Sequence, residues 1–249
     1  MSTLIGKILT QAEAYLHELP APPAPLVAPE GADLAGWIDH TILKPEATET
    51  QIRQLCAEAR EQHFATVCVN PAYVPLSAEL LAGSGVGVCS VVGFPLGATF
   101  PEMKAAETRQ VIQAGATEID TVINFGALKS GNFELALRDV EAVVEAAAGR
   151  AHVKVILEMC YLDQREKIIG SLLCQAAKAD FVKTSTGFGP SGATAADVAL
   201  MRRLVGAEMG VKAAGGIRTL ADARQMISAG ANRLGASAGI SILKEAGVA

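Results

Sequence analysis

The sequence predicts a closed barrel of eight parallel strands alternating with helices, a (β/α)8 TIM barrel, with an extra N-terminal helix. The length of 249 residues suits one barrel domain. Half of the residues are hydrophobic and only 4% are aromatic, while 24 are glycine, a composition typical of repeated parallel βα units. Short apolar runs also alternate with helical segments along most of the chain.

Eight apolar runs have the length of buried strands, and each is followed by a stretch with helix signals. Several of these helices are expected to begin after a capping side chain, namely Thr48, Asp163, Thr194 and Thr219. Eight strand–helix units favour a closed barrel. A doubly wound open sheet, the second choice, is disfavoured because no GxGxxG follows the first run. The runs are residues 36–43, 64–69, 86–92, 118–123, 152–158, 180–184, 210–214 and 232–235.

The first 35 residues precede the barrel. Residues 3–19 have the spacing of an amphipathic helix, whose expected apolar face consists of Leu4, Ile8, Ala12, Tyr15 and Leu19. The segment PAPPAPLVAP (20–29) is too rich in proline for a helix and predicts an extended linker. We therefore divide the chain into a helix and Pro-rich linker, 1–35, and a barrel domain, 36–249. The helix is expected to pack on the outside of the barrel or at a subunit contact.

Charge and composition argue against several classes of protein. The formal net charge is −5 and no run of Lys or Arg is present, which disfavours nucleic acid and anionic membranes as partners. No apolar stretch of about 18 residues predicts a membrane span. The five cysteines form no CxxC pair, which indicates reduced thiols in the cytoplasm. The four histidines are scattered, so their spacing predicts no metal site, and no cofactor is expected.

Two lysines stand in otherwise apolar strands. Lys183 ends the sixth run and Lys212 lies in the seventh. Because neighbouring strands lie about 4.8 Å apart, both ammonium groups can approach one point. Like charges disfavour the protonated form, which is one way to make an amine nucleophilic enough for a Schiff base. The alternative is that each lysine only neutralises Asp39 in the first run or Asp120 in the fourth.

Three other strand residues carry weaker signals. Lys154, near the start of the fifth run, is interpreted as structural because barrel active sites form at the opposite end of the strands. Glu158 lies near the correct end, but a single carboxylate is a weak signal. Cys68 is interpreted as a small core residue.

Glycine-rich loops after the last three runs predict a phosphate site. TGFG (186–189) follows the sixth run, AGGIR (214–218) the seventh, and GAS (235–237) the eighth. Glycine lets backbone N–H groups approach an anion, and barrels often bind phosphate in this sector. An ordinary turn would explain any one of these loops, but three loops in one sector favour phosphate.

Five segments match a known family in order. The chain carries IDHTILKP (38–45), EIDTVIN (118–124), ADFVKTSTGF (179–188), VKAAGGIRT (211–219) and RLGAS (233–237). These segments resemble the deoxyribose-phosphate aldolases, class I aldolases that act through a lysine Schiff base. The resemblance covers residues 36–245 and leaves out only the N-terminal helix and linker. Its most specific parts are KTSTG and KAAGGIR.

The resemblance implies reversible cleavage of 2-deoxy-D-ribose 5-phosphate to D-glyceraldehyde 3-phosphate and acetaldehyde, without a metal. It implies Lys183 as the Schiff-base lysine, Lys212 as the lysine that perturbs it, and Asp120 as the carboxylate of a proton relay. Homo-oligomer formation is left open. The expected substrate-binding residues are Asp39, Thr41, Thr186, Gly187, Gly215, Gly216, Arg218, Gly235 and Ser237.

Two positions depart from the family pattern. Phe188 stands where some members have a lysine, and Ala238 where some have a second serine; no tyrosine follows Tyr161, although some members end in a tyrosine-bearing tail. Phosphate binding is therefore expected to be weaker or to depend more on backbone amides. Two alternatives are another phosphosugar barrel enzyme, which gives no reason for paired lysines, and a non-catalytic sugar-phosphate binding protein, which needs no free amine.

Overall fold

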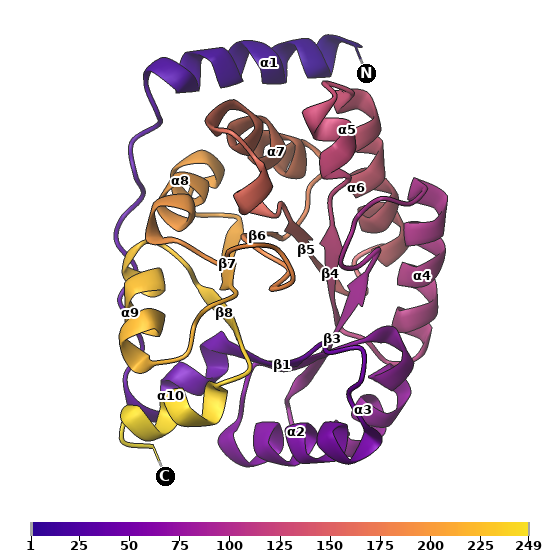
Figure 1. Ribbon diagram of the computed structural model, residues 1–249, viewed down its shortest axis with the longest axis vertical. Coiled ribbons are helices and arrows are strands. Elements are labelled where there is room, and N and C mark those ends of the chain that lie inside the picture. Colours follow the sequence, from indigo (N-terminus) through magenta and orange to yellow (C-terminus); the bar gives the residue numbers. More distant parts are fainter. Residues whose placement is uncertain (1, 249) are drawn as a thin grey trace.

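Eight parallel strands close into a barrel in the order in which they follow along the chain (Figure 1). The structure, a computed structural model, describes residues 2–248. Its topology confirms the predicted (β/α)8 barrel. The strands are β1 (Ile38–Ile42), β2 (Thr66–Val69), β3 (Gly87–Val92), β4 (Glu118–Val122), β5 (His152–Ile156), β6 (Phe181–Lys183), β7 (Gly210–Ala214) and β8 (Arg233–Ala236).

Helices cover the outside of the barrel, and the four predicted caps are confirmed. Thr48, Asp163 and Thr219 form capping boxes, and Thr194 accepts a hydrogen bond from the N–H of Asp197. The α-helices are α1 (Ser2–His17), α2 (Glu49–Gln62), α3 (Val74–Leu81), α4 (Pro101–Gln113), α5 (Phe125–Lys129), α6 (Phe133–Ala147), α7 (Gln164–Ala176), α8 (Ala195–Val205), α9 (Leu220–Ser228) and α10 (Gly239–Glu245). The 3-10 helices are η1 (Gly31–Trp37), η2 (Pro71–Tyr73) and η3 (Met159–Tyr161).

The predicted strands differ from the observed ones mainly at their ends. The first was expected to begin at residue 36, but η1 extends to Trp37, so β1 begins at Ile38. The fifth was expected to reach residue 158, but β5 ends at Ile156. Glu158 has a left-handed backbone conformation (φ 52°, ψ 62°), and a residue in that region cannot continue a strand.

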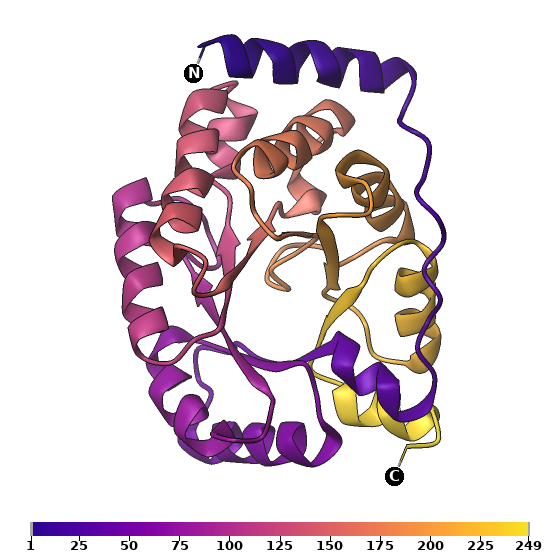
Figure 2. The ribbon, with the colours of Figure 1, turned by 180° about the vertical axis from the view of Figure 1, so that it is seen from behind.

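Helix α1 lies across the outside of the barrel against α7 and α6 (Figure 1). The Pro-rich linker then runs down the side of the barrel past α8 and α9 to η1, which packs against α10 (Figure 2). Arg203 of α8 holds the start of the linker by donating to the carbonyls of Leu19 and Pro20, at 2.9 and 2.7 Å. The predicted apolar face of α1 is wrong at Leu4, which is 39% exposed. Its buried face consists of Ile5, Ile8 and Ala12.

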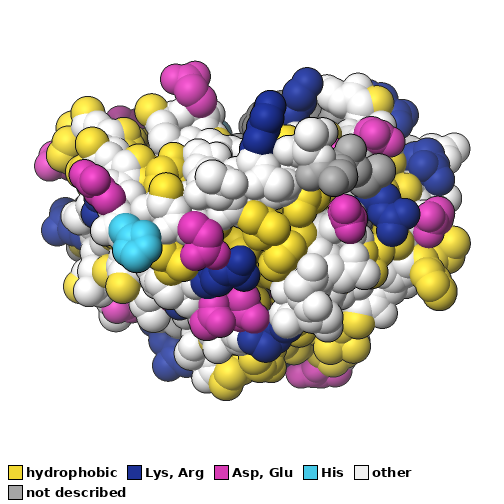
Figure 3. Space-filling model, turned by 90° about the horizontal axis from the view of Figure 1, so that it is seen from above, with side chains coloured by type: hydrophobic (Ala, Val, Ile, Leu, Met, Phe, Trp, Pro, Cys, Tyr) yellow, Lys and Arg dark blue, Asp and Glu magenta, His cyan; other side chains and the backbone are white. Residues whose placement is uncertain are grey.

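The surface that carries α1 is chemically mixed. Cationic, anionic and apolar side chains are interspersed on this face, and no single charge dominates it (Figure 3). Within residues 2–248, no helix combines the length and the apolar composition that a membrane crossing requires.

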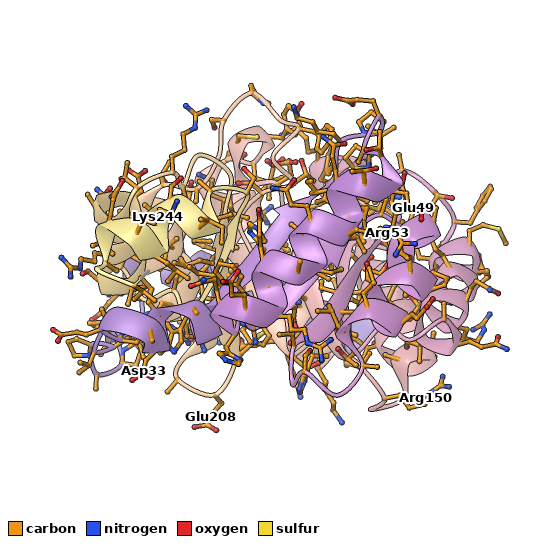
Figure 4. The ribbon with its side chains drawn as sticks, turned by 90° about the horizontal axis from the view of Figure 1, so that it is seen from below. Asp33, Glu49, Arg53, Arg150, Glu208 and Lys244 are labelled. Atoms are coloured by element: carbon orange, nitrogen blue, oxygen red, sulfur yellow. The ribbon has the colours of Figure 1, made fainter. Side chains whose placement is uncertain are left out.

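The two ends of the barrel are distinct. Asp33, Arg150 and Glu208 precede β1, β5 and β7, and they lie along one rim of the molecule in Figure 4. Glu49, at the start of α2, follows β1 and lies toward the other rim, beside Arg53, to which it is paired at 2.6 Å. The loops that follow the strands, including the glycine-rich ones, therefore share the rim toward which Glu49 lies.

A buried ion pair connects α4 and α6 to the end of β4. The Nζ of Lys104 lies 2.6 Å from Oδ2 of Asp139 and donates to the carbonyl of Val122, also at 2.6 Å. The same carboxylate oxygen accepts the N–H of Asn124 at 2.8 Å. Both charged side chains are buried, so either charge would be costly without the other.

Lys104→Met should lower the free energy of unfolding by about 3–5 kcal/mol, because it leaves Asp139 as an uncompensated buried charge. Lys129→Met is the matched control. Lys129 pairs with Glu166, but its side chain is 47% exposed, and exposed pairs contribute about 1 kcal/mol or less. Urea denaturation measures both variants. Small and equal losses would show that the buried pair does not stabilise the fold.

Candidate active site

Asp120 of β4 lies at the centre of the barrel and accepts hydrogen bonds from three lysines. Its Oδ2 lies 2.6 Å from the Nζ of Lys183 and 2.7 Å from the Nζ of Lys212. Its Oδ1 lies 2.8 Å from the Nζ of Lys154. Lys183 and Lys212 are register neighbours on β6 and β7, and Lys154 of β5 is the register partner of Asp120. The Nζ atoms of Lys183 and Lys212 therefore contact the same carboxylate oxygen, as the distance between neighbouring strands predicts.

Three further charged residues extend this arrangement. Asp39 of β1 contacts Lys212 and accepts from Arg233 of β8 at 2.7 Å. Glu118 of β4 lies 2.6 Å from Lys154 and 3.3 Å from Arg233. We call the whole group the buried ion cluster, which consists of Asp39, Glu118, Asp120, Lys154, Lys183, Lys212 and Arg233. Its four cations face three carboxylates, so full ionisation leaves one excess positive charge, and one ammonium group can lose its proton without unbalancing the cluster.

The ion pairs decide which groups keep their charge. Burial alone would lower the pKa of Lys212, but Asp120 and Asp39 outweigh it and hold that pKa above the ordinary lysine value. The pKa of Lys154 is raised well above that value, because Asp120 and its other acidic neighbours also outweigh burial. Burial would raise the pKa of Asp120, but its three lysines hold it well below the usual value. At neutral pH, Lys212 and Lys154 are therefore cationic and Asp120 is ionised.

A cavity of about 390 Å³ lies over the C-terminal ends of the strands and reaches Lys183. Within residues 2–248 its wall contains no carboxylate, and its basic side chains are Lys44, Lys183 and Arg218. In a chain of net charge −5, such a wall favours an anionic ligand. A larger groove of about 780 Å³ lies outside the barrel between α4 and α6 and contacts no residue of the buried ion cluster. Charge rather than volume therefore identifies the site.

Most of the predicted substrate-binding residues line this cavity. Gly215 and Gly216 both have positive φ (86° and 83°), which glycine adopts without steric cost. Asp39 is the exception: its carboxylate lies in the buried ion cluster rather than in the wall. The predicted residues in the wall are Thr41, Lys183, Thr186, Gly187, Gly215, Gly216, Arg218, Gly235 and Ser237.

Lys154, interpreted as structural, lies outside the cavity wall but belongs to the buried ion cluster. The sequence predicted no role for Glu118 and Arg233, which also belong to the cluster, or for Cys89, which lies beside it. The backbone of Lys154 lies near the start of β5, as expected, but its long side chain extends to Asp120. The Sγ of Cys89 lies 3.1 Å from Asp120 and 3.4 Å from Lys154. One signal was available: Glu118 and Asp120 are two positions apart, and alternate residues of a strand share a face.

Among the described residues, the barrel also brings together one group of metal-ligand atoms that sequence spacing did not reveal. Cys68, Cys89 and Asp120, from three different strands, offer donor atoms within 4.8 Å of one another. However, Asp120 already accepts from three ammonium groups, and these repel a cation. The arrangement therefore fits an ion cluster better than a metal site.

Lys154→Met should lower the free energy of unfolding by about 3–5 kcal/mol near neutral pH, because it leaves buried carboxylates with fewer cations. The lowered pKa of Asp120 sets the pH dependence. Its ionised form contributes stability that is present above the unfolded carboxyl pKa, about 3.9, and is lost as pH falls toward the folded value.

The difference between wild type and Lys154→Met should therefore be largest near neutrality and shrink below about pH 4. Urea titrations at both conditions measure it. Lys244→Met is the control with the same change of charge, because Lys244 is an exposed residue of α10. A loss of stability that does not change with pH would contradict the assignment of Lys154 to this cluster.

Comparison with known proteins gives the family. The profile of the DeoC/LacD family aldolases matches residues 34–246. The deoxyribose-phosphate aldolase of Streptococcus gordonii is 60% identical over 208 residues, which cover 84% of this chain and 94% of the relative. That of Lysinibacillus sphaericus is 57% identical over 211 residues, which cover 85% and 95%.

Solved structures agree in fold. A crystal structure from Coccidioides immitis, of a protein assigned as a deoxyribose-phosphate aldolase, has a TM-score of 0.92 at 42% identity and covers 98% of both chains. The tetrameric deoxyribose phosphate aldolase of Aeropyrum pernix has a TM-score of 0.80 at 37% identity and covers 95% of both chains. The chain therefore belongs to the DeoC/LacD family of aldolases, and it is a lyase of the deoxyribose-phosphate aldolase type.

Proposed function

We propose that the chain reversibly cleaves 2-deoxy-D-ribose 5-phosphate to D-glyceraldehyde 3-phosphate and acetaldehyde through a Schiff base on Lys183. One observation carries the assignment of the lysine. Among the described lysines of the buried ion cluster, Lys183 alone lines the cavity. The names of the relatives support deoxyribose phosphate as the substrate, and the cationic wall fits a phosphate group.

The charge balance supports Lys183 as the group that loses its proton. Among the described residues, Lys183 pairs with one carboxylate, Asp120, which it shares with two other lysines. Lys212 pairs with two carboxylates and Lys154 with three. Deprotonation of Lys183 removes the excess positive charge of the cluster and leaves a nucleophilic amine at the cavity wall.

The proposed reaction needs this amine, water and groups that donate and accept protons. The amine adds to the aldehyde carbon of the open-chain sugar, and loss of water gives an iminium ion. The C2–C3 bond then breaks: its electron pair moves into the iminium, and the C3 hydroxyl passes its proton to a water molecule, from which it can return to the enamine carbon. Glyceraldehyde 3-phosphate leaves and an enamine stays on Lys183. Protonation of the enamine carbon and hydrolysis release acetaldehyde and restore the amine.

Asp120 and Lys212 are proposed to position the reacting amine and to set the charge around it. Asp120 is a weak base because its pKa is held well below the usual value. Lys212 stays cationic, and its Nζ lies 2.7 Å from the carboxylate oxygen that also contacts Lys183. In this proposal Lys212 supplies positive charge and a hydrogen-bond donor beside the imine nitrogen. Asp120 holds both amines in place as the carboxylate of the relay.

The phosphate is proposed to lie among the loops that follow β6, β7 and β8. Gly187, Gly215 and Gly216 have positive φ, a conformation that lets backbone N–H groups approach an anion closely. Arg218 and Ser237 add side-chain donors to the same wall.

Assembly and location are inferred from coarser observations. The Aeropyrum pernix aldolase is tetrameric, which supports a homo-oligomer for this chain as well. The five cysteines are free thiols, which supports a reducing compartment such as the cytoplasm.

Reduction with borohydride in the presence of acetaldehyde should attach an ethyl group to Lys183, because the reductant traps the imine as a secondary amine. Peptide mass spectrometry locates the label. Lys183→Arg keeps the positive charge and should abolish labelling, whereas Lys244→Arg on α10 should leave it unchanged. A label on Lys212 with Lys183 unmodified would reverse the two roles. Absence of any label would favour a non-catalytic sugar-phosphate binding protein.

Lys212→Leu should lower kcat/KM near neutral pH and recover part of it as pH rises. Without Lys212, three cations face three carboxylates in the buried ion cluster. Deprotonation of Lys183 would then leave the cluster with an excess negative charge and is disfavoured. The loss of kcat/KM should therefore be largest near neutral pH and should decrease by up to about tenfold per pH unit as pH rises.

The pH profile of kcat/KM for wild type, Lys212→Leu and Lys212→Arg tests this account. The arginine variant keeps the positive charge and should show a smaller alkaline shift. If Lys212→Leu loses activity equally at every pH, Lys212 acts in proton transfer or positioning and the electrostatic account is wrong.

A further inference from the structure

Glu158, two residues after β5, has a backbone conformation that residues with a side chain rarely adopt. Its φ of 52° and ψ of 62° bring Cβ close to the following carbonyl oxygen. Its neighbours are fixed to the end of the β6 strand: the N–H of Leu157 donates to the carbonyl of Lys183, and that of Met159 to the carbonyl of Thr184, both at 3.0 Å. The fold therefore holds a strained residue at the catalytic end of the barrel.

This conformation directs the carboxylate to the turn after β6. The carboxylate oxygens lie 3.2 and 3.3 Å from the backbone N of Thr186, and one of them also accepts the Thr186 hydroxyl. The hydroxyl oxygen of Thr186 in turn accepts the N–H of Phe188 at 3.0 Å. A Cβ placed on Gly189 would lie 3.2 Å from the Glu158 carboxylate. The turn at residues 186–189 therefore packs directly on this buried carboxylate.

The same turn forms part of the cavity wall. Thr186, Gly187 and Phe188 line the cavity, whereas Glu158 does not and is only 2% exposed. Gly187 has a positive φ of 88°, and its N–H has no hydrogen-bond acceptor within residues 2–248. The turn thus offers the cavity an unused backbone donor.

We propose that Glu158 is a positioning residue for the phosphate: it fixes the turn at residues 186–189 so that the N–H of Gly187 is available to the anion. The inference rests on the proposed function, which supplies the phosphate. Glu158 does not touch the substrate. A carboxylate suits the role because it accepts from the N–H and the hydroxyl of Thr186 together, and an amide has only one acceptor oxygen.

Steady-state kinetics on two sugars test the proposal. Glu158→Ala should raise KM for 2-deoxyribose 5-phosphate by about tenfold, and kcat and the kinetic constants for unphosphorylated 2-deoxyribose should stay close to wild type. Glu158→Gln keeps one acceptor oxygen, and its KM for 2-deoxyribose 5-phosphate should lie between those of wild type and Glu158→Ala. An equal loss of kcat/KM on both sugars would overturn the proposal, because a general structural defect does not distinguish them.

A second pair of variants separates backbone strain from the carboxylate. Glu158→Gly relieves the left-handed conformation but removes the acceptor. Lys178→Gly relieves a comparable conformation (φ 60°) before β6, at the opposite end of the barrel. Both should keep a Tm near or above that of wild type, and only Glu158→Gly should raise KM for the phosphorylated sugar. A wild-type KM in Glu158→Gly would overturn the proposal.

Calorimetric titration of the unreacted full chain with inorganic phosphate keeps this inference distinct from the proposed function. The Kd for phosphate should rise about tenfold in Glu158→Ala and Glu158→Gly and stay unchanged in Lys178→Gly. Equal Kd values in wild type and the Glu158 variants, or no phosphate binding by wild type, would overturn the inference. A wild type that binds phosphate but does not cleave 2-deoxyribose 5-phosphate would contradict the proposed function alone, and the titration would still decide the role of Glu158.

Discussion

The carboxylate of Asp120, buried at the barrel axis, and the three ammonium groups that donate to it constrain the rest of the site. None of these charges is tolerable in the interior alone, because a buried ion without its partner is costly. The residues come from β4, β5, β6 and β7, so only a closed barrel brings them together. Any backbone shift that separates one strand from the others would leave a buried charge unpaired.

The same cluster that constrains the fold sets the reactivity of the proposed nucleophile. Carboxylates surround Lys154 and Lys212 on more than one side and keep both cationic, whereas Lys183 shares a single carboxylate. Lys183, which has fewer carboxylate partners than Lys154 and Lys212, is also the lysine of the cluster that lines the cavity. The number of carboxylate partners and the position in the barrel therefore distinguish Lys183 from the other two lysines as the proposed nucleophile, without a separate activating group.

Strands and loops have different proposed functions at this cavity. The strands hold the charged groups proposed to act in catalysis, and glycine-containing loops form the wall proposed to bind phosphate. The loop after β6 joins the two, since it follows Lys183 directly and rests on the strained Glu158. Strain is tolerated there because two backbone hydrogen bonds to the end of β6 hold the residues on either side of Glu158.

The sequence by itself determined the order of strands and helices, because apolar periodicity and helix caps are local: Thr48, Asp163, Thr194 and Thr219 all cap helices where expected. It also determined that Lys183 and Lys212 would meet, because neighbouring parallel strands leave little choice of distance. Tertiary structure alone decided the partners of each lysine, the reach of Lys154 into the centre and the left-handed turn at Glu158. These depend on contacts between residues far apart in the chain, such as Lys212 and Asp120, which are 92 positions apart, and only closure of the barrel sets those distances.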